Sequence, residues 1–336
     1  MSLMRRIIIA LVALAFVATV VMVASSLSSY DWKRGFAVET LGLPPLGQTN
    51  DGTVRIAANG FEFRARIVDL DQAGAPVLML HGFPETSAMW TPLLDACRAA
   101  GRPAVAFDQR GYSALARPTE RDRYAIQDLV GDVLAVADAL GWKRFHLVGH
   151  DWGAAVGWVA TLAASERVIS WTALSIPHPA AFGAALANDP EQQKRSRYFM
   201  LFRTPWLPEL LFSFNHFALL SEMYGPMPTA EKAEYLRVFA EPGALTAALN
   251  WYRAMDLRAL DGASLGASLD VVRPVLFIWG NRDVAVSRAS VDGQRVYMKG
   301  PFQEFELDAS HWLMEEVPDQ ITPRVLAHFA AADISA

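Results

Sequence analysis

The sequence predicts an α/β fold: a mostly parallel sheet flanked by helices, with an inserted helical cap and an N-terminal transmembrane helix. Three observations support this. Short apolar runs alternate with helical patterns, the alternation is interrupted once in mid-chain, and a long uncharged stretch lies near the N-terminus. Strands that alternate with helices are typical of a parallel sheet covered on both faces. The 336 residues, 52% hydrophobic and 19% charged, are ordinary for a globular protein.

The uncharged stretch, residues 7–24, reads IIIALVALAFVATVVMVA and follows two arginines. As a helix, its roughly 18 residues would span about 27 Å, close to the hydrocarbon thickness of a bilayer. A buried core helix would seldom be apolar on every face. The other interpretation is a cleaved signal peptide, whose apolar region is usually about 7–15 residues. The small residues Ala24, Ser25 and Ser26 offer a cleavage position, so secretion after cleavage stays the alternative to an anchor within residues 1–25.

The arginines Arg5 and Arg6 favour a cytoplasmic N-terminus, which would put the main domain on the extracytoplasmic side. Lys33 and Arg34, on the other side of the apolar stretch, weaken that asymmetry. Residues 26–50 are expected to be a linker. A mild net charge of −5 and the lack of a basic stripe with interleaved aromatics argue against nucleic acid as a partner.

The core is predicted in two parts, residues 51–177 and 267–336. In the first part, two strands are expected within 53–70, followed by strands at 76–82, 103–111, 145–151 and 168–177, and by helices at 87–101, 125–141 and 153–165. In the second part, strands are expected at 273–283 and 303–310 and a final helix at 319–332.

Residues 178–266 interrupt the alternation. They are rich in Phe, Leu, Ala, Trp and Tyr and contain no clear buried strand, so we expect a helical cap. In open α/β sheets, ligands bind outside the carboxyl ends of the strands. A cap inserted at a strand's carboxyl end would form a roof over that site.

Three polar residues follow predicted strands. Asp151 lies in GHDWG, Asp283 follows VLFIWGNR, and His311 follows FELDAS. The order nucleophile, acid, histidine is the chain order of α/β-hydrolases, whose nucleophile elbow is usually G-x-S-x-G. Here the nucleophile position holds aspartate instead of serine.

Each residue also has a structural interpretation. Asp151 could cap the following helix, Asp283 could close a turn, and His311 could be a hydrogen-bonded core histidine. The two glycines of GHDWG favour the elbow, because a tight turn needs small residues two before and two after its centre. Asp308 is a rival acid, but it lies only three residues from His311 and more simply shapes the local turn.

An aspartate nucleophile indicates attack on saturated carbon. A serine would form an ether there, which water does not readily cleave. An aspartate forms an alkyl ester, which water can hydrolyse at the carboxyl carbon. Asp151 would attack, and His311, oriented by Asp283, would activate water in the second step.

The loop HGFPE, residues 81–85, is expected to complete the site. In α/β-hydrolases the residue after the nucleophile and one residue of such a loop supply backbone N–H donors to the oxyanion. Here these residues are Trp152 and Phe83, since Pro84 has no N–H. No histidine–carboxylate cluster has metal-ligand spacing, so neither a metal nor a cofactor is implied.

Taken together, HGFPE, DQRGYS, GHDWGA, NWYRAM and the late SHW resemble the epoxide hydrolases of the α/β-hydrolase fold, from about Asp51 to the C-terminus. The resemblance implies that two cap tyrosines bind and protonate the epoxide oxygen, and their motifs place them at Tyr198 and Tyr252, with Tyr224 as the alternative to Tyr198. It also implies a supporting role for Glu85 in positioning water, with His81 in the same motif. The aromatic cap favours an apolar epoxide.

Two other functions stay open. A haloalkane or haloacid dehalogenase could use the same aspartate, with indole N–H groups such as those of Trp206 or Trp251 holding the halide. Haloalkane dehalogenases commonly carry a polar residue where this chain has Phe83, and fluoroacetate dehalogenases usually carry an arginine where it has Trp152. A non-catalytic membrane-tethered binding protein is the remote alternative.

Overall fold

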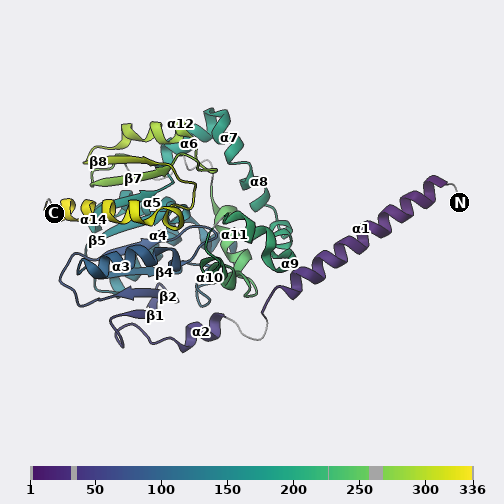
Figure 1. Cartoon of the computed structure of the whole chain (residues 1–336), viewed down its shortest axis with the longest axis horizontal. Helices are drawn as coiled ribbons and strands as arrows, with labels where there is room; N and C mark the ends of the chain where they lie inside the picture. Colours follow the sequence, from purple (N-terminus) through teal and green to yellow (C-terminus); the bar gives the residue numbers. More distant parts are fainter. Residues whose placement is uncertain (1–2, 32–35, 226, 257–267, 335–336) are drawn as a thin grey trace.

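The computed structural model describes residues 3–31, 36–225, 227–256 and 268–334, and it confirms the α/β class (Figure 1). Within these ranges, eight strands form one sheet in the order β1-β2-β4-β3-β5-β6-β7-β8. Only the β1–β2 and β2–β4 pairs are antiparallel, and the other neighbours are parallel. The strands are β1 (Gly52–Ala58), β2 (Phe61–Val68), β3 (Val77–Leu80), β4 (Ala104–Phe107), β5 (Phe145–His150), β6 (Val168–Leu174), β7 (Val275–Gly280) and β8 (Phe302–Leu307).

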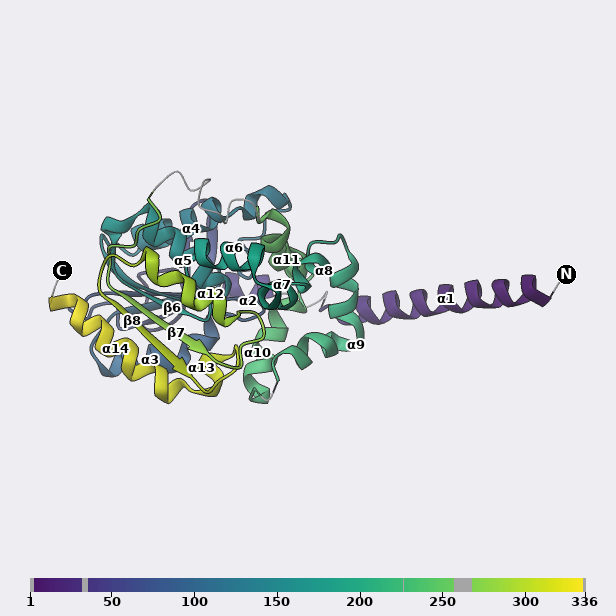
Figure 2. The same cartoon turned by 90° about the horizontal axis from the view of Figure 1, so that it is seen from above.

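Helices cover both faces of the sheet, which explains the continuous apolar runs of its central strands. Leu78 and Leu80 of β3 belong to the core cluster that includes residues of α4 (Ile126–Ala139) and α5 (Trp152–Ala163). Their neighbours Val77 and Met79 belong to the cluster that includes α3 (Thr91–Ala99) and α14 (Pro318–Ile334). Figure 2 shows these two helical layers on opposite sides of the strands.

A helical segment lies between β6 and β7 in the chain, and we call it the cap. Its described part contains no strand, as expected, and it lies at one end of the sheet (Figure 1). The predicted boundary at residues 266–267 falls within 257–267, outside the described residues. The cap helices are α6 (Pro179–Asn188), α7 (Pro190–Arg195), α8 (Tyr198–Phe202), α9 (Leu207–Met223), α10 (Thr229–Phe239) and α11 (Ala244–Ala254), and short helices α12 (Arg288–Asp292) and α13 (Leu313–Glu316) follow β7 and β8.

The N-terminal helix α1 (Leu3–Ser28) projects away from the rest of the protein in both views (Figures 1 and 2). In the described part of the chain, its segment Ala10–Ser28 is the one helix long and apolar enough to cross a membrane. Large apolar side chains along it are exposed, for example Phe16 at 69%. Such exposure fits a helix that is solvated by lipid or removed as a signal sequence.

The segment expected to be a plain linker is partly structured. Helix α1 continues through Ser28, and α2 (Phe36–Gly42) lies before β1. Leu46 packs against the core, and its N–H donates to the carbonyl of Arg55 at 2.8 Å. These contacts bring the chain to the edge strand of the sheet.

Candidate active site

Three loops at the carboxyl ends of β5, β7 and β8 bring Asp151, Asp283 and His311 together. His311 Nδ1 lies 2.8 Å from Oδ2 of Asp283, and its Nε2 lies 3.4 Å from Oδ2 of Asp151. All three side chains are buried. The histidine therefore lies between two carboxylates that are distant in sequence, in the arrangement that the sequence predicted.

Asp151 occupies a strained turn between β5 and α5. Its φ of 49° and ψ of −120° are unusual for a residue with a side chain. A Cβ on Gly149 would lie 2.4 Å from the carbonyl oxygen of Gly153, and one on Gly153 would lie 2.1 Å from that of Leu80. These approaches explain the small residues on both sides of the aspartate and fit a nucleophile elbow.

Asp283, and not Asp308, contacts the histidine. The Oδ1 atom of Asp283 accepts hydrogen bonds from the N–H groups of Ala285 at 2.7 Å and Val286 at 3.2 Å, which leaves Oδ2 for His311. The Asp308 side chain is 84% exposed and pairs with Arg282 at 2.9 Å. The rival acid thus lies at the surface.

Electrostatics favour an imidazolium between two carboxylates. Burial opposes the charged form of His311, but the charge of Asp283 and hydrogen bonds to both aspartates raise the histidine's pKa well above its usual value. Burial also opposes ionisation of Asp151. Hydrogen bonding and charge from His311, the charge of His150 and the Phe83 N–H outweigh that effect, so the pKa of Asp151 lies below its usual value.

One donor of the expected oxyanion site contacts Asp151. The N–H of Phe83 donates to Oδ1 of Asp151 at 2.9 Å. The tight packing of Gly82, whose Cβ would lie 2.4 Å from that of Asp151, lets the loop approach so closely. Phe83 thus binds Oδ1, and Oδ2 is the oxygen that faces His311. Trp152 begins α5 directly after the aspartate.

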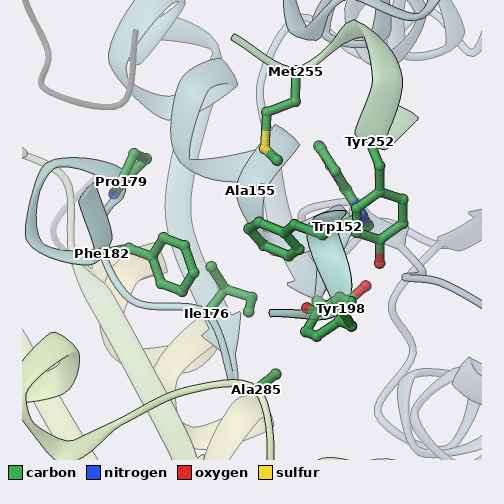
Figure 3. A pocket seen from close by; sticks show the side chains of 11 residues that line it. Trp152, Ala155, Ile176, Pro179, Phe182, Tyr198, Tyr252, Met255 and Ala285 are labelled. Atoms are coloured by element: carbon green, nitrogen blue, oxygen red, sulfur yellow. The ribbon is translucent and has the colours of Figure 1, made fainter. Parts of the chain in front are cut away.

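Asp151, Tyr198 and Tyr252 line one apolar cavity. Tyr198 comes from α8 and Tyr252 from α11, and their ring centroids are 6.1 Å apart. Figure 3 shows both tyrosines on the same side of the pocket, with apolar side chains around the remainder. The other lining residues are Trp152, Ala155, Ile176, Pro179, Phe182, Phe199, Met255 and Ala285, most of which the sequence had not singled out.

The two tyrosines are protonated near neutral pH. Burial raises the pKa of Tyr198 well above its usual value, and the charges of Asp151 and Asp283 add to this. Burial likewise raises the pKa of Tyr252, with further contributions from Tyr198 and Asp151. Tyr224, the alternative to Tyr198, does not line this cavity and donates its hydroxyl hydrogen to the carbonyl of Pro84 at 2.7 Å.

His81 holds the HGFPE loop in place through hydrogen bonds to the backbone. Its Nε2 accepts the N–H of Gln109 at 3.0 Å, so Nδ1 carries the hydrogen and donates to the carbonyl of Gly82 at 2.9 Å. Burial lowers the pKa of His81, which agrees with this neutral form. The side chain of His81 therefore holds the loop that carries Phe83. Its two ring nitrogens bind the backbone of Gly82 and Gln109 and not Asp151.

Glu85 reaches the site through a histidine that sequence reasoning missed. Its Oε2 lies 2.7 Å from Nδ1 of His150, and Nε2 of His150 lies 2.9 Å from the carbonyl oxygen of His311. Glu85 and His150 are both fully buried. The position of His150, beside Asp151 at the end of a buried strand, was the available signal for its role.

Comparison with known proteins places the chain among α/β-hydrolases. The α/β-hydrolase fold family matches residues 75–318. Epoxide hydrolase 4 of Homo sapiens is 33% identical over 79% of this chain and 75% of its own length. Epoxide hydrolase A of Mycobacterium tuberculosis is 31% identical over 81% of this chain and 95% of its own. A solved variant of an epoxide hydrolase from Bacillus megaterium, complexed with its naphthyloxy-propanediol product, superposes with a TM-score of 0.75 at 27% identity, covering 82% of this chain and 99% of that one.

Proposed function

The chain belongs to the epoxide hydrolases of the α/β-hydrolase fold, and from this premise we propose that it converts an apolar epoxide into a vicinal diol through a covalent ester on Asp151. The observation that carries this proposal is the single cavity in which Asp151 faces Tyr198 and Tyr252. The cavity is mostly apolar, and the related Bacillus megaterium enzyme was solved with an aryloxy diol. An aryl or alkyl epoxide of similar size is therefore the proposed substrate class.

In the first step, Oδ2 of Asp151 attacks one epoxide carbon, and the bond from that carbon to the epoxide oxygen breaks. The oxygen leaves as an alkoxide and takes a proton from Tyr198 or Tyr252. Both hydroxyls keep their protons near neutral pH, so either can act as the acid. The product of this step is a hydroxyalkyl ester of Asp151.

In the second step, water attacks the carboxyl carbon of that ester, and His311 takes a proton from the water. The bond from the carboxyl carbon to the alkyl oxygen then breaks, and the leaving alkoxide takes that proton from His311 to give the diol. The remaining proton of the regenerated Asp151 carboxyl group returns to the tyrosinate formed in the first step. Once the ester has formed, the negative charge of Asp151 is gone, and one cause of the raised pKa of His311 disappears. The pKa of His311 therefore falls after alkylation, which favours its action as a base in this step. The N–H groups of Phe83 and Trp152 stabilise the oxyanion, an effect worth about 3–4 kcal/mol for each donor.

Halide displacement is the other reaction open to this aspartate. The two cap indoles considered for that role lie elsewhere: Trp251 donates its N–H to the carbonyl of Arg110 at 2.9 Å, and Trp206 is 70% exposed. Neither lines the cavity. This arrangement supports epoxide opening over dehalogenation.

A single-turnover experiment in H₂¹⁸O tests the mechanism. With enzyme in excess over a styrene-oxide-type substrate, the ester route puts an unlabelled Asp151 oxygen in the diol and ¹⁸O in the protein. Direct attack by water would label the diol and refute the covalent route. Asp151→Asn should form no adduct, whereas His311→Gln should accumulate one that mass spectrometry detects. Halide release from chloroalkanes without diol formation from epoxides would favour the dehalogenase.

For localisation we propose that α1 stays attached as a membrane anchor, with the catalytic domain on the extracytoplasmic side. Its length and exposed apolar surface support an anchor, and Arg5 and Arg6, at its N-terminal end before the uncharged stretch, support the orientation. Edman sequencing of the membrane-bound protein tests the first part, since a chain beginning near Ser25 would indicate a cleaved signal. Protease protection in sealed vesicles tests the orientation.

A further inference from the structure

Cap helix α9 is broken in the middle, at a point where α1 meets it. Residues 214–217 leave the helical conformation, and three of them have positive φ values of 49°, 53° and 62°. Left-handed backbone costs roughly 1–2 kcal/mol for each such residue. The break also removes helical partners from nearby backbone groups, which need other hydrogen bonds.

Serines at the end of α1 bind the carbonyl groups before the break. The hydroxyl of Ser26 donates to the carbonyl of Leu210 at 3.1 Å, and the hydroxyl of Ser29 donates to that of Ser213 at 2.6 Å. These are carbonyls that an unbroken helix would pair with residues 214 and 217. Ser26 of α1 and Ser29, directly after it, thus replace the hydrogen bonds that α9 gives up.

The amides of the break are bound from the same side. The N–H of Asn215 donates to Oγ of Ser25 at 3.0 Å, and the N–H of His216 donates to Oγ of Ser29 at 3.0 Å. Together with the two carbonyl contacts, these bonds form what we call the α1–α9 joint. It connects the N-terminal helix to the cap and not to the sheet.

The contacts continue past the end of α1. The ring of Tyr30 packs edge-on against Phe217, with centroids 5.8 Å apart. The N–H of Asp31 donates to the carbonyl of Ala240, at the end of α10, at 2.8 Å. The chain therefore stays on the cap for at least two residues after the joint.

No free linker separates the apolar stretch from the cap. The uncharged residues 7–24 end immediately before Ser25, the first serine of the joint. One helical turn rises only about 5.4 Å, so α9 lies within about one turn of the end of that stretch. Figures 1 and 2 both show α9 beside this end of α1.

The neighbouring cap helices expose apolar side chains. Met200 of α8 and Trp206, before α9, are each 70% exposed, and Phe214 and Leu219 of α9 are 38% and 43% exposed. Isolated exposed apolar residues are common on soluble proteins. Here α9 contacts the apolar helix α1, and α8 packs against α9. Tryptophan is enriched at membrane interfaces.

We propose that this α8–α9 face, defined by Met200, Trp206, Phe214 and Leu219, rests on the surface of the lipid bilayer and is held there by the α1–α9 joint. The inference rests on the anchor proposed above. Helix α8 carries Tyr198 in the cavity as well as Met200 on this face. The helix that contributes to substrate binding therefore lies at the membrane surface, where apolar epoxides concentrate.

Site-specific labelling of the full chain tests this contact. Met200→Cys and Leu219→Cys carry a bimane label, and Val296→Cys, at a position 66% exposed between α12 and β8, is the matched control. The native Cys97 is fully buried and does not compete for the label. Each protein is reconstituted in phosphatidylcholine vesicles with or without brominated acyl chains. Bromine should quench the label at positions 200 and 219 and leave position 296 unchanged.

The outcomes separate the contact from the anchor. Protein that floats with the vesicles but shows no quenching at positions 200 and 219 refutes the contact and leaves the anchor intact. Protein that does not float refutes both. A blue shift at position 200 without bromine quenching would mean that a second protein copy covers the face. In the triple variant Ser25→Ala, Ser26→Ala, Ser29→Ala, the protein should still float and lose the quenching, and unchanged quenching would show that the joint does not place the cap.

Discussion

The imidazole of His150 links the carboxylate of Glu85 to the backbone of the loop that carries His311. Nδ1 lies 2.7 Å from Glu85 Oε2, and Nε2 lies 2.9 Å from the His311 carbonyl oxygen. A carbonyl only accepts, so Nε2 carries a hydrogen. The bond to Glu85 then needs one further proton, on either the imidazole or the carboxyl group. Glu85 thus helps hold His311 in place without touching Asp151.

We predict that Glu85→Gln slows ester hydrolysis by about 10-fold, less than the 10²–10⁴-fold of a direct general base, and barely changes alkylation. The glutamine amide can still donate to Nδ1 of neutral His150, so the fold should be kept. Rapid-quench mass spectrometry of the Asp151 ester measures both steps. If the variant and the parent had the same alkylation rate and the same hydrolysis rate, Glu85 would have only a structural role.

The cap tyrosines are predicted to act in alkylation. Removing one hydroxyl by Tyr198→Phe or Tyr252→Phe leaves the other to protonate the oxygen, so each variant should lose about 10-fold in the alkylation rate, and the double variant about 10³-fold. Single-turnover kinetics measure this rate. Tyr124→Phe is the control, because its hydroxyl donates to the carbonyl of Pro118 at 2.7 Å and lies outside the cavity lining. A double variant as fast as the control would remove the tyrosines from the chemistry.

The two candidate acids should behave differently. Asp283→Asn leaves the imidazole without its charged partner, and hydrolysis of the ester should slow by on the order of 10³–10⁴-fold, as when the acid of a catalytic triad is replaced. Asp308→Asn changes an exposed side chain and should leave both steps unaltered. Comparable losses in the two variants would contradict the geometry.

The two steps should depend differently on pH. Asp151 has a lowered pKa, so alkylation should be independent of pH from about 5 to 8, because the carboxylate stays ionised. Ester hydrolysis needs neutral His311 and should rise with pH until the histidine loses its proton. Asp283 raises the pKa of His311, so Asp283→Asn should move the rise of the hydrolysis rate to lower pH. Hydrolysis that falls as pH rises through neutrality would exclude His311 as the base.

The same pKa shift affects stability with a definite sign. The pKa of His311 is higher in the folded state than its unfolded value of about 6.5, so the charged cluster stabilises the fold fully below that value. This contribution is lost as pH rises through the folded pKa. His311→Gln should therefore flatten the decline of unfolding free energy at alkaline pH, as measured by urea denaturation.

Much of the sheet and the grouping of Asp151, Asp283 and His311 could be predicted from the sequence. All residues of β5 and β7 are buried, so their apolar runs were direct signals, and Asp151 and Asp283 follow these strands. Residues that act through distant partners could not be found this way. His150 became visible only when the structure placed it between Glu85 and the loop of His311.

The break in α9 shows a second limit. LLFSFNHFALL, residues 210–220, reads as one apolar segment, and no glycine or proline marks an interruption. The break is stabilised by Ser25, Ser26 and Ser29, which lie about 185 residues earlier in the chain. Local sequence patterns predict the conformation that a segment prefers by itself, whereas the break in α9 depends on a tertiary contact.

The turn that carries Asp151 depends on the close packing of Gly153 against β3. A methyl group on Gly153 would lie 2.1 Å from the carbonyl oxygen of Leu80, and backbone on both sides would have to move. We expect Gly153→Ala to lose more than about 3 kcal/mol of unfolding free energy, the range of severe overpacking. Gly131→Ala is the matched control, because its methyl group would lie an ordinary 3.6 Å from Asn59 in the middle of α4.

The control should be neutral or stabilising by up to about 1 kcal/mol, because alanine favours helix over glycine. Pulse proteolysis of the full chain in urea measures both variants under the same conditions. If Gly153→Ala matched the parent in stability and in alkylation rate, then β3 and the elbow would not be packed as closely as the structure shows. The position of Asp151 Oδ1 against the Phe83 N–H, which depends on that packing, would then also be incorrect.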